Sequence, residues 1–523
     1  MSDTPGPQRA WRAACPNCGA PVDFASAASP VAVCSFCRST LARDGEALRR
    51  IGVSAELFDD HSPLQLGTSG RHQGVAFRLV GRLQMQTAEG RWNEWSALFD
   101  DGRHGWLSED NGRYVLGFDA PLADLPPEPG ALALGATVPL AGRRWQVGAV
   151  TRAKVGAAEG ELPAPPAAGE ITLVELRSPT GEVGTLDYSD PRQPAWSIGR
   201  GVDLADLQLQ GLKDAAEKAV AARGAECPNC GSALEIRLET TQSIVCGNCK
   251  AVVDVSQGVG GDLKHHLQGA RPKWPQLIPL GATGELAFDG PKRAWQVVGF
   301  AERWEDAEDA EDEPSPWHEY LLYHRGQGFA FLVQSEEGWS WAVPITGAPE
   351  VRGRAALWNG TTFRELYRYG AHTHYVLGEF YWRVERDQRT SHIDYGAPSA
   401  RLNREQSADE VTWSLGAPMP AEQVRQAFGL KDPRAAALAS DEQPLAASGA
   451  AGRSWVTTLV LLMVVLLVLV VLARACSADD CDRVRATFGA ESAEYRDCQR
   501  SGSGFRTSGG SWGGGGSSGG GHK

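Results

Sequence analysis

The sequence predicts a mainly β protein made of repeated small antiparallel β-sheet modules, barrel- or sandwich-like, with two zinc ribbons and one transmembrane helix. Three observations predict this fold class. Two four-cysteine cassettes share one spacing, strand-like segments recur along the chain, and residues 455–473 form one uncharged apolar run. With 523 residues, the chain is long enough for about three or four domains.

The two cassettes both read C-x2-C-x15-C-x2-C, a spacing typical of zinc ribbons. A C-x2-C pair turns the backbone so that both sulfurs face one point, and two such pairs complete a tetrahedron. Four thiolates leave no open position on zinc, so we expect two structural zinc ions rather than catalytic ones. The predicted ligands are Cys15, Cys18, Cys34 and Cys37 in the first site and Cys227, Cys230, Cys246 and Cys249 in the second.

Disulfide bonding is the alternative for these cysteines. Residues 1–14 are polar and contain prolines, unlike a secretory signal peptide, so zinc and a reducing compartment are favoured. A redox C-x2-C motif is expected once, within an α/β pattern, rather than twice in a four-ligand arrangement. Gly19 and Gly231 fit turns with positive φ, and Arg38 and Lys250 place a cation beside each second pair.

Strand-like segments are the second observation. Residues 134–137 (LGAT) and 143–147 (RRWQV) recur as residues 280–283 (LGAT) and 293–297 (RAWQV), and a weaker copy begins at Leu66. Each copy alternates apolar and polar residues between Gly, Pro or Asp turns, which is the period of half-buried antiparallel strands. We therefore expect three small sheets of about four to six strands each.

A tryptophan-containing pattern also repeats, since residues 92–95 (WNEW) resemble residues 317–320 (WHEY). A binding platform is one interpretation of this pattern. Core packing by the alternate aromatics is the simpler one, with Glu94 and Glu319 facing outward, because two-residue periodicity alone predicts it.

Proline- and alanine-rich stretches separate these pieces. Short helices are expected at residues 213–223 and 421–428, the second ended by Gly429. The expected organisation is zinc ribbon 10–45, β modules 60–119 and 132–210, zinc ribbon 224–256, β module 275–350, C-terminal β segment with a short helix 354–430, linker 431–454, transmembrane helix 455–473 and tail 474–523.

The third observation is the valine- and leucine-rich run at residues 455–473. As a helix it would reach about 28 Å, close to the roughly 30 Å hydrocarbon core of a bilayer. We expect a single-pass anchor in the inner (plasma) membrane, although the flanking charges barely decide its orientation. The reduced thiolates place the large N-terminal part in the cytoplasm and the tail outside.

The tail has an odd number of cysteines, Cys476, Cys481 and Cys498, which allows one disulfide and one further thiol. Residues 506–523 are mostly glycine and serine. Such a composition cannot bury a core, so we expect this segment to be disordered.

The chain is acidic, with a formal charge of −13 from 64 acidic and 51 basic side chains. Nucleic-acid surfaces are basic, and no basic cluster surrounds either cassette, so nucleic-acid binding is disfavoured. The acidic stretch at residues 305–313 is expected to be a solvated loop within a hairpin.

Residues 375–384 (YVLGEFYWRV), with Asp394 and Trp413 further on, resemble the signature of the bacterial domain-of-unknown-function 4178 family. The strand repeats resemble the N-terminal half of that family, so the resemblance covers most of residues 64–430. Residues 397–398 are Ala-Pro where two prolines are expected. The resemblance implies a membrane-associated accessory role, because the family's genes lie near polyamine-metabolism and small membrane-protein genes. It supplies no catalytic residues.

The same segment concentrates ionisable side chains. An H-x-H pair on a strand points both imidazoles to one face and could bind a metal, but a third ligand is missing, so solvated histidines are the simpler interpretation. Two of the glutamates could form an acid/base pair or make structural hydrogen bonds. The candidates are His372, His374, Glu379, His392, Asp394 and Glu405.

We expect the chain to be a membrane-anchored, non-enzymatic scaffold or accessory protein with protein partners. No nucleophile elbow, phosphate-binding Gly-Lys-Ser/Thr loop or dinucleotide fingerprint occurs in the sequence. One alternative is an enzyme or sensor that binds a small cationic, polyamine-like metabolite through Glu379, Asp394 and Glu405. The second alternative is a nucleic-acid-binding zinc-ribbon protein.

Overall fold

The computed structural model describes residues 11–431 and 481–501 apart from short gaps, and the chain divides into two compact units, Met1–Gln443 and Pro444–Lys523. The expected helix at 213–223 falls largely in a gap, and the expected linker and membrane span lie outside the described residues. The gaps are residues 27–28, 45–46, 58–61, 89, 111, 124, 214–222, 239–240, 257–262, 269–271, 273–274, 289, 307–315, 337 and 386–387.

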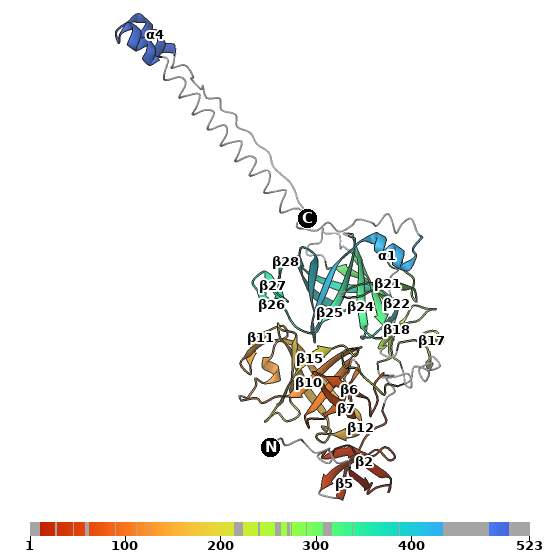
Figure 1. The fold of residues 1–523 in the computed structure, drawn as a ribbon. Helices are drawn as coiled ribbons and strands as arrows, with labels where there is room; N and C mark the ends of the chain where they lie inside the picture. The colour runs from red at the N-terminus through yellow and green to blue at the C-terminus, as the bar shows by residue number, and fades with distance from the viewer. Residues whose placement is uncertain are drawn as a thin grey trace. The chain divides into compact units, whose positions relative to one another are not determined.

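The first unit contains two closed antiparallel β-barrels of eight strands each (Figure 1). Barrel 1, orange to yellow in Figure 1, has the order β7-β8-β9-β10-β15-β14-β13-β12, and β12 pairs with β7 to close it. Its strands, with the flanking β6 and β11, are β6 (Ser69–His72), β7 (Val75–Gln86), β8 (Arg91–Phe99), β9 (His104–Asp110), β10 (Arg113–Asp119), β11 (Thr137–Leu140), β12 (Arg143–Leu162), β13 (Glu170–Arg177), β14 (Glu182–Asp187) and β15 (Ala195–Val202).

Barrel 2, green to blue in Figure 1, has the equivalent order β22-β23-β24-β25-β31-β30-β29-β28 and closes between β28 and β22. The expected helix follows it as α1 (Ala421–Phe428), ended by Gly429 in the left-handed conformation. The strands are β21 (Thr283–Leu286), β22 (Arg293–Glu305), β23 (Pro316–His324), β24 (Gly328–Ser335), β25 (Gly338–Ile345), β26 (Glu350–Arg352), β27 (Ala355–Trp358), β28 (Thr361–Phe380), β29 (Arg389–Ala397), β30 (Ala400–Gln406) and β31 (Val411–Met419).

A cysteine-containing ribbon precedes each barrel and continues its sheet. In ribbon 1, β3 pairs with the end of β12, and in ribbon 2, β18 pairs with the end of β28. Ribbon 1 consists of β1 (Trp11–Ala14), β2 (Pro21–Phe24), β3 (Val31–Val33), β4 (Ser39–Asp44) and β5 (Ala47–Val53), and ribbon 2 of β16 (Arg223–Glu226), β17 (Ala233–Ile236), β18 (Ser243–Val245), β19 (Val252–Asp254) and β20 (His265–His266).

Each barrel consists of two similar four-stranded halves, so the chain contains four copies of one half-barrel. The sequence repeats mark three of them: the N–H groups of Gly67, Gly135 and Gly281 each donate to the strand ahead at 2.8 Å. A β-bulge follows in β7, β12 and β22, and β28 carries one at the matching place. The fourth copy lacks the LGAT sequence and starts from β27.

The strand repeats, whose packing the sequence left open, combine in pairs. The strands of ranges 60–119 and 132–210 close one barrel, and those of 275–350 and 354–430 close the other. A half-barrel leaves two unpaired edges, and closure against a second half removes them.

The core of each half-barrel contains a fully buried aromatic side chain. Trp95 and Trp145 are fully buried in the two halves of barrel 1, and Tyr320 and Trp413 in those of barrel 2. These inward residues alternate with more exposed ones along each strand, as the two-residue period requires.

Hydrogen bonds also join the two barrels. Arg177 of β13 donates to Val411 O at 2.9 Å and to Glu410 Oε1 at 3.0 Å. Trp413 Nε1 donates to Gln146 Oε1 at 2.7 Å. The barrels of the first unit are thus bonded to each other through β13, β12 and the start of β31.

The described part of the second unit is helical, with residues 481–488 followed by α4 (Ala493–Ser501). Cys481 is disulfide-bonded. None of the described helices is long and apolar enough to cross a membrane.

Candidate functional site

The sulfur atoms of each predicted cysteine set lie together. All four are within 4.8 Å of one another in both ribbons. Of the described residues, only these two sets bring three or more potential metal ligands that close. The nearest sulfurs are 3.6 Å apart in Cys15–Cys37 and Cys227–Cys249 and 3.7 Å apart in Cys18–Cys34 and Cys230–Cys246.

This geometry fits a tetrahedral metal ion. Zinc–sulfur bonds of about 2.3 Å put the sulfurs of a tetrahedral site about 3.8 Å apart. A disulfide needs about 2.05 Å, and all eight cysteines are free, so the disulfide alternative is wrong. Four thiolates are a donor set that suits a soft metal ion, which would be structural because the four sulfurs leave no open position in a tetrahedral site.

The backbone turns that carry the cysteines explain the residues beside them. Gly19 and Gly231 have φ of +76° and +72°, as predicted. Arg38 and Lys250 also have positive φ, +58° and +62°, which the sequence analysis did not foresee for residues with a side chain. Arg38 pairs with Glu56 at 3.2 Å, while Lys250 Nζ donates to a carbonyl of its own turn at 2.6 Å.

One serine hydroxyl supports each cysteine set. Cys37 Sγ lies 3.2 Å from Ser39 Oγ, and Cys230 Sγ lies 3.4 Å from Ser232 Oγ. These contacts lower the pKa of both thiols to about 5 and so favour the thiolate that binds a metal.

A buried glutamate attaches each ribbon to its barrel, Glu161 in the first and Glu379 in the second. The sequence pointed to Glu379 only as a candidate side chain, and Glu161 was not among the candidates. Glu379 accepts hydrogen bonds from Arg237 N and Leu238 N at 3.0 and 2.9 Å and from Thr241 Oγ1 at 2.6 Å. Glu161 accepts hydrogen bonds from Ala25 N and Ser26 N of ribbon 1. Both glutamates follow a glycine in the barrel seam, so the repeated Gly-Glu pair was the available signal.

Glu379 is therefore a structural residue and not a free acid/base. Burial raises its pKa, and its acceptor positions are occupied by ribbon 2. Glu405 lies on another strand, in a separate polar network, so the expected Glu379–Glu405 pair does not form.

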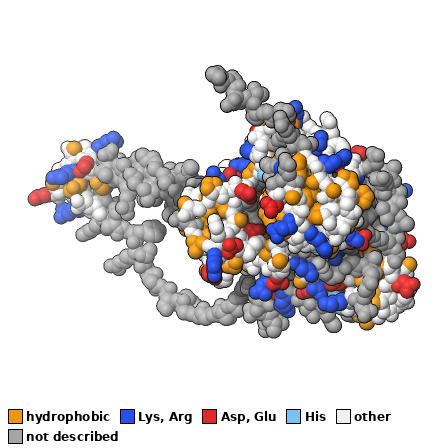
Figure 2. All heavy atoms as spheres, turned by 90° about the horizontal axis from the view of Figure 1, so that it is seen from below, with side chains coloured by type: hydrophobic (Ala, Val, Ile, Leu, Met, Phe, Trp, Pro, Cys, Tyr) orange, Lys and Arg blue, Asp and Glu red, His pale blue; other side chains and the backbone are white. Residues whose placement is uncertain are grey.

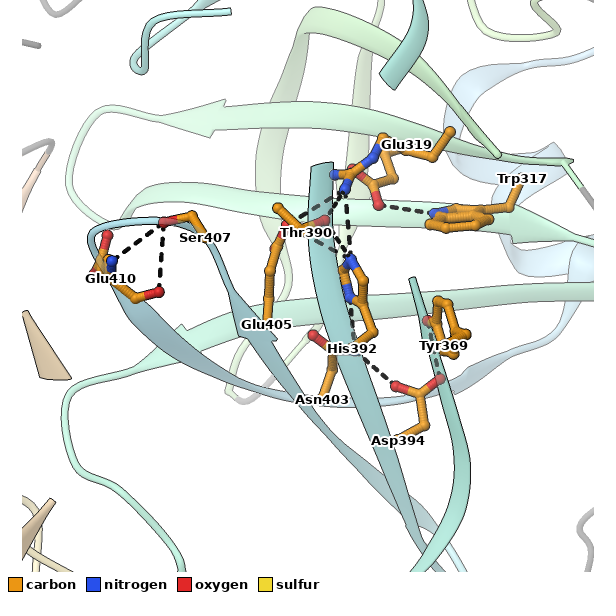
Figure 3. A network of polar contacts seen from close by, with 11 residues as sticks. Trp317, Glu319, Tyr369, Thr390, His392, Asp394, Asn403, Glu405, Ser407 and Glu410 are labelled. Atoms are coloured by element: carbon orange, nitrogen blue, oxygen red, sulfur yellow. Dashed lines mark hydrogen bonds and ion pairs between the residues drawn. The ribbon is translucent and has the colours of Figure 1, made fainter. Parts of the chain in front are cut away.

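That network is centred on Arg303 and His392 in barrel 2. Figure 3 shows His392 between Thr390 and Asn403. Arg303 Nη2 donates to Thr390 Oγ1 at 2.6 Å and lies 3.4 Å from Glu405 Oε1, while Nη1 is 3.6 Å from Glu319. Burial alone would raise the pKa of Glu405, but the charges of Arg303 and His392, together with the hydrogen bonds from Arg303 and Thr390, outweigh burial and lower it. The carboxylate of Glu405 is thus already neutralised by its neighbours.

Asp394 belongs to the other side of the same network. It accepts hydrogen bonds from Asn403 Nδ2 at 2.7 Å and Tyr369 OH at 3.1 Å, and the Tyr369 ring stacks on His392 with centroids 5.0 Å apart. Burial raises the pKa of Asp394. Figure 3 shows these side chains directed toward one another.

The two histidines of the H-x-H pair have separate partners. His372 Nδ1 is 2.8 Å from Asp306 Oδ1, and the His374 ring packs on Trp304 with centroids 4.8 Å apart. Neither belongs to a set of three ligand atoms within the described residues. Both are partly buried rather than solvated.

The network is specific to barrel 2. The pairings Gly81–Gly160 and Gly299–Gly378 align the barrels, so that Met85 corresponds to Arg303. At the equivalent place barrel 1 has an apolar cluster that includes Met85, Ala153 and Ile171. The two barrels therefore share a backbone but differ in chemistry at this position.

The repeated tryptophan pattern combines core packing with a hydrogen bond. Trp92 Nε1 donates to Glu94 Oε1 at 2.7 Å, and Trp317 Nε1 donates to Glu319 Oε1 at 2.8 Å. The glutamates are partly buried and do not simply face outward.

On the face shown in Figure 2, acidic and basic side chains are interspersed with hydrophobic ones.

The comparisons with known proteins agree with the barrel boundaries. A family model described as "Domain of unknown function (DUF4178)" matches residues 65–204 and 287–421, which together are more than half of the chain. Each match spans one barrel, whereas the resemblance was expected to run as a single region. No curated protein and no solved structure matches the chain.

Proposed function

The chain belongs to the domain-of-unknown-function 4178 family, and from this premise we propose that it is a membrane-tethered, non-enzymatic scaffold that holds protein partners. The observation that carries the proposal is the continuity of ribbon and barrel. In both copies a strand of the cysteine ribbon extends the barrel sheet, and a buried glutamate bonds to the ribbon backbone. Metal binding would then fix the shape of a surface.

The proposed scaffold function is also supported by the hydrogen bonds and ion pairs that the ionisable candidate residues form. Glu379 bonds to ribbon 2, Glu405 and Asp394 bond within the network of barrel 2, and His372 pairs with Asp306. These contacts give the side chains structural partners and do not favour the cationic-metabolite alternative.

The membrane tether is part of the proposal and rests on the apolar run at residues 455–473. Cysteine chemistry on the two sides of this run supports an orientation. The eight ribbon cysteines are free, as in a reducing compartment, whereas Cys481 beyond the run is disulfide-bonded. We therefore place the barrels in the cytoplasm, at the inner membrane, and the tail outside.

The test is purification of the full chain from membranes in mild detergent. We expect two zinc ions per chain, one for each cysteine set, and stoichiometric protein partners. Cys15→Ser and Cys227→Ser should each remove one zinc ion and reduce partner recovery. Recovery of the zinc-loaded chain with no stoichiometric partner would contradict the scaffold.

The orientation is tested with a membrane-impermeant maleimide on intact cells after mild reduction. We expect labelling of the tail cysteines, while the ribbon cysteines are labelled only after permeabilisation and zinc chelation. Labelling of Cys15 in intact cells would reverse the orientation.

A further inference from the structure

The free edges of the barrel sheets differ in how they are covered. An exposed sheet edge presents unpaired N–H and C=O groups, so proteins normally shorten or cover it. Here β6 is covered, since Ser69 and Arg71 bond to Gln210 and Leu207. At the far end of barrel 2, α1 packs against β21, where Phe428 meets Gly284. The edge strand β20 of ribbon 2 has only two residues.

The edge strand β5 of ribbon 1 is longer than the other edge strands β6, β11, β20, β21 and β26. It has seven residues and pairs with β4 alone, and although β1 approaches it, no other strand of the described chain pairs with it. The neighbouring β1 pairs with β2 and contributes Trp11 to the core on which Leu48 packs. Beyond Leu48, β5 is therefore open for backbone hydrogen bonding.

The side chains of this edge are apolar and basic. Val53 is 57% exposed and Ile51 37% exposed. Arg49 and Arg50 are exposed, and no carboxylate of the described residues forms an ion pair with either; Arg50 reaches only Asn17 Oδ1, at 3.4 Å. In contrast, Arg12 and Arg38 of the same ribbon are paired with Asp23 and Glu56.

We propose that the outer edge of β5 adds an extended acidic segment of a protein partner as a further strand. Arg49 and Arg50 are successive strand residues on opposite faces, so each selects an acidic side chain on its own face of the added strand. Ile51 and Val53 contact apolar side chains of that strand, and the β5 backbone supplies hydrogen bonds. A second copy of this chain is disfavoured at the edge, because β5–β5 pairing brings the like-charged arginines of the two copies together. This inference names a partner class and rests on the proposed scaffold.

The test uses the zinc-loaded full chain in detergent and a fluorescent peptide with two successive Glu residues beside Val residues, which presents one carboxylate on each face of the strand. A Lys-Val peptide, with Lys in place of each Glu, serves for comparison. Fluorescence anisotropy should show binding of the acidic peptide only, weakened by added salt. Arg49→Glu with Arg50→Glu should lower the affinity about tenfold or more. Lys264→Glu beside β20 is the matched control and should leave it unchanged.

Hydrogen exchange then distinguishes strand addition from loose charge attraction. Alternate amides of β5 should gain protection when the acidic peptide binds, while zinc content stays at two in every variant. Equal binding of the Lys-Val peptide, protection away from β5, or self-association abolished by the two Arg→Glu changes would each overturn the proposal. If partners are still recovered from membranes in that case, the scaffold stands and its docking surface lies elsewhere.

Discussion

At the scale of single residues, the two barrels differ in the hydrogen bonding of one equivalent buried residue. In barrel 1, Glu109 accepts hydrogen bonds from Trp95 Nε1 at 2.8 Å, Asn93 Nδ2 at 3.1 Å and Ser62 Oγ at 2.6 Å. The equivalent residue of barrel 2 is Gln334, which pairs with His318 as Glu109 pairs with Asn93. Gln334 is 1% exposed, and neither of its amide atoms has a hydrogen-bond partner among the residues that the structure describes.

The orphaned amide predicts a stabilising substitution. A buried polar group without a partner costs about 1–3 kcal/mol, so Gln334→Leu should leave the free energy of unfolding unchanged or raise it by about 1 kcal/mol. Glu109→Leu is the matched control and should lower it by several kcal/mol, because its donors lose their acceptor. Chemical denaturation measures both, and equal destabilisation by the two changes would contradict the assignment.

The ribbon-attaching glutamates make a second prediction at this scale. Glu379→Gln presents an NH2 group to the N–H donors of Arg237 and Leu238, so these amides should exchange faster by hydrogen exchange. Barrel 2 itself should keep its protection. Glu161→Gln should do the same in ribbon 1 only, and a uniform loss of protection throughout either variant would argue against local attachment.

At the scale of elements, barrel closure depends on glycine at the seam. A Cβ built on Gly81 would lie 1.8 Å from Glu161 O, and one on Gly299 would lie 2.8 Å from Glu379 O. The strands β7 and β12, or β22 and β28, approach each other closely only where the side chain is absent. The Gly81–Gly160 and Gly299–Gly378 pairs therefore set the register of closure.

Gly81→Ala should consequently be far more disruptive than an ordinary strand glycine substitution. We expect a loss of several kcal/mol and a lower melting temperature, since backbone must move to admit the methyl group. Gly117→Ala, whose Cβ would meet only atoms at 3.6 Å or more, is the control and should change stability by less than about 1 kcal/mol. A tolerated Gly81→Ala would show that the seam can widen.

The elements that sequence reasoning identified are those with a local signal. Helix α1 was predicted with its bounds, because amphipathic spacing and Gly429 act within a few residues. The half-barrel starting at β27 was not recognised as a fourth repeat, because it lacks the LGAT sequence. Only its bulge and its hairpin resemble those of the other three half-barrels.

At the scale of the whole first unit, Arg177 is a buried polar link between the barrels, beside the hydrogen bonds of Arg113 to Pro344 O and of Trp413 to Gln146. Its guanidinium is held by Glu175, Glu410 and the carbonyl of Val411, and burial opposes its charge while the two carboxylates raise its pKa. Removing one partner of such a cluster leaves the others without compensation.

Arg177→Met should therefore uncouple the barrels. We expect one thermal transition to broaden or split into two, with zinc content unchanged, as measured by calorimetry. Arg143→Met, which removes an exposed pair with Glu182 within barrel 1, is the control and should leave a single transition. An unchanged transition in Arg177→Met would mean that the remaining contacts, including Trp413–Gln146, suffice.

The sequence by itself determined the two cysteine sets that could hold a metal ion, the mainly β class, the family and the apolar run, because each is encoded in short spacings or a local period. Tertiary structure decided how the repeats combine: four half-barrels close into two barrels, since closure requires pairing between β7 and β12 or β22 and β28, far apart in the chain. It also decided what Glu379 and Glu405 do, because a carboxylate's role depends on the donors that folding brings to it.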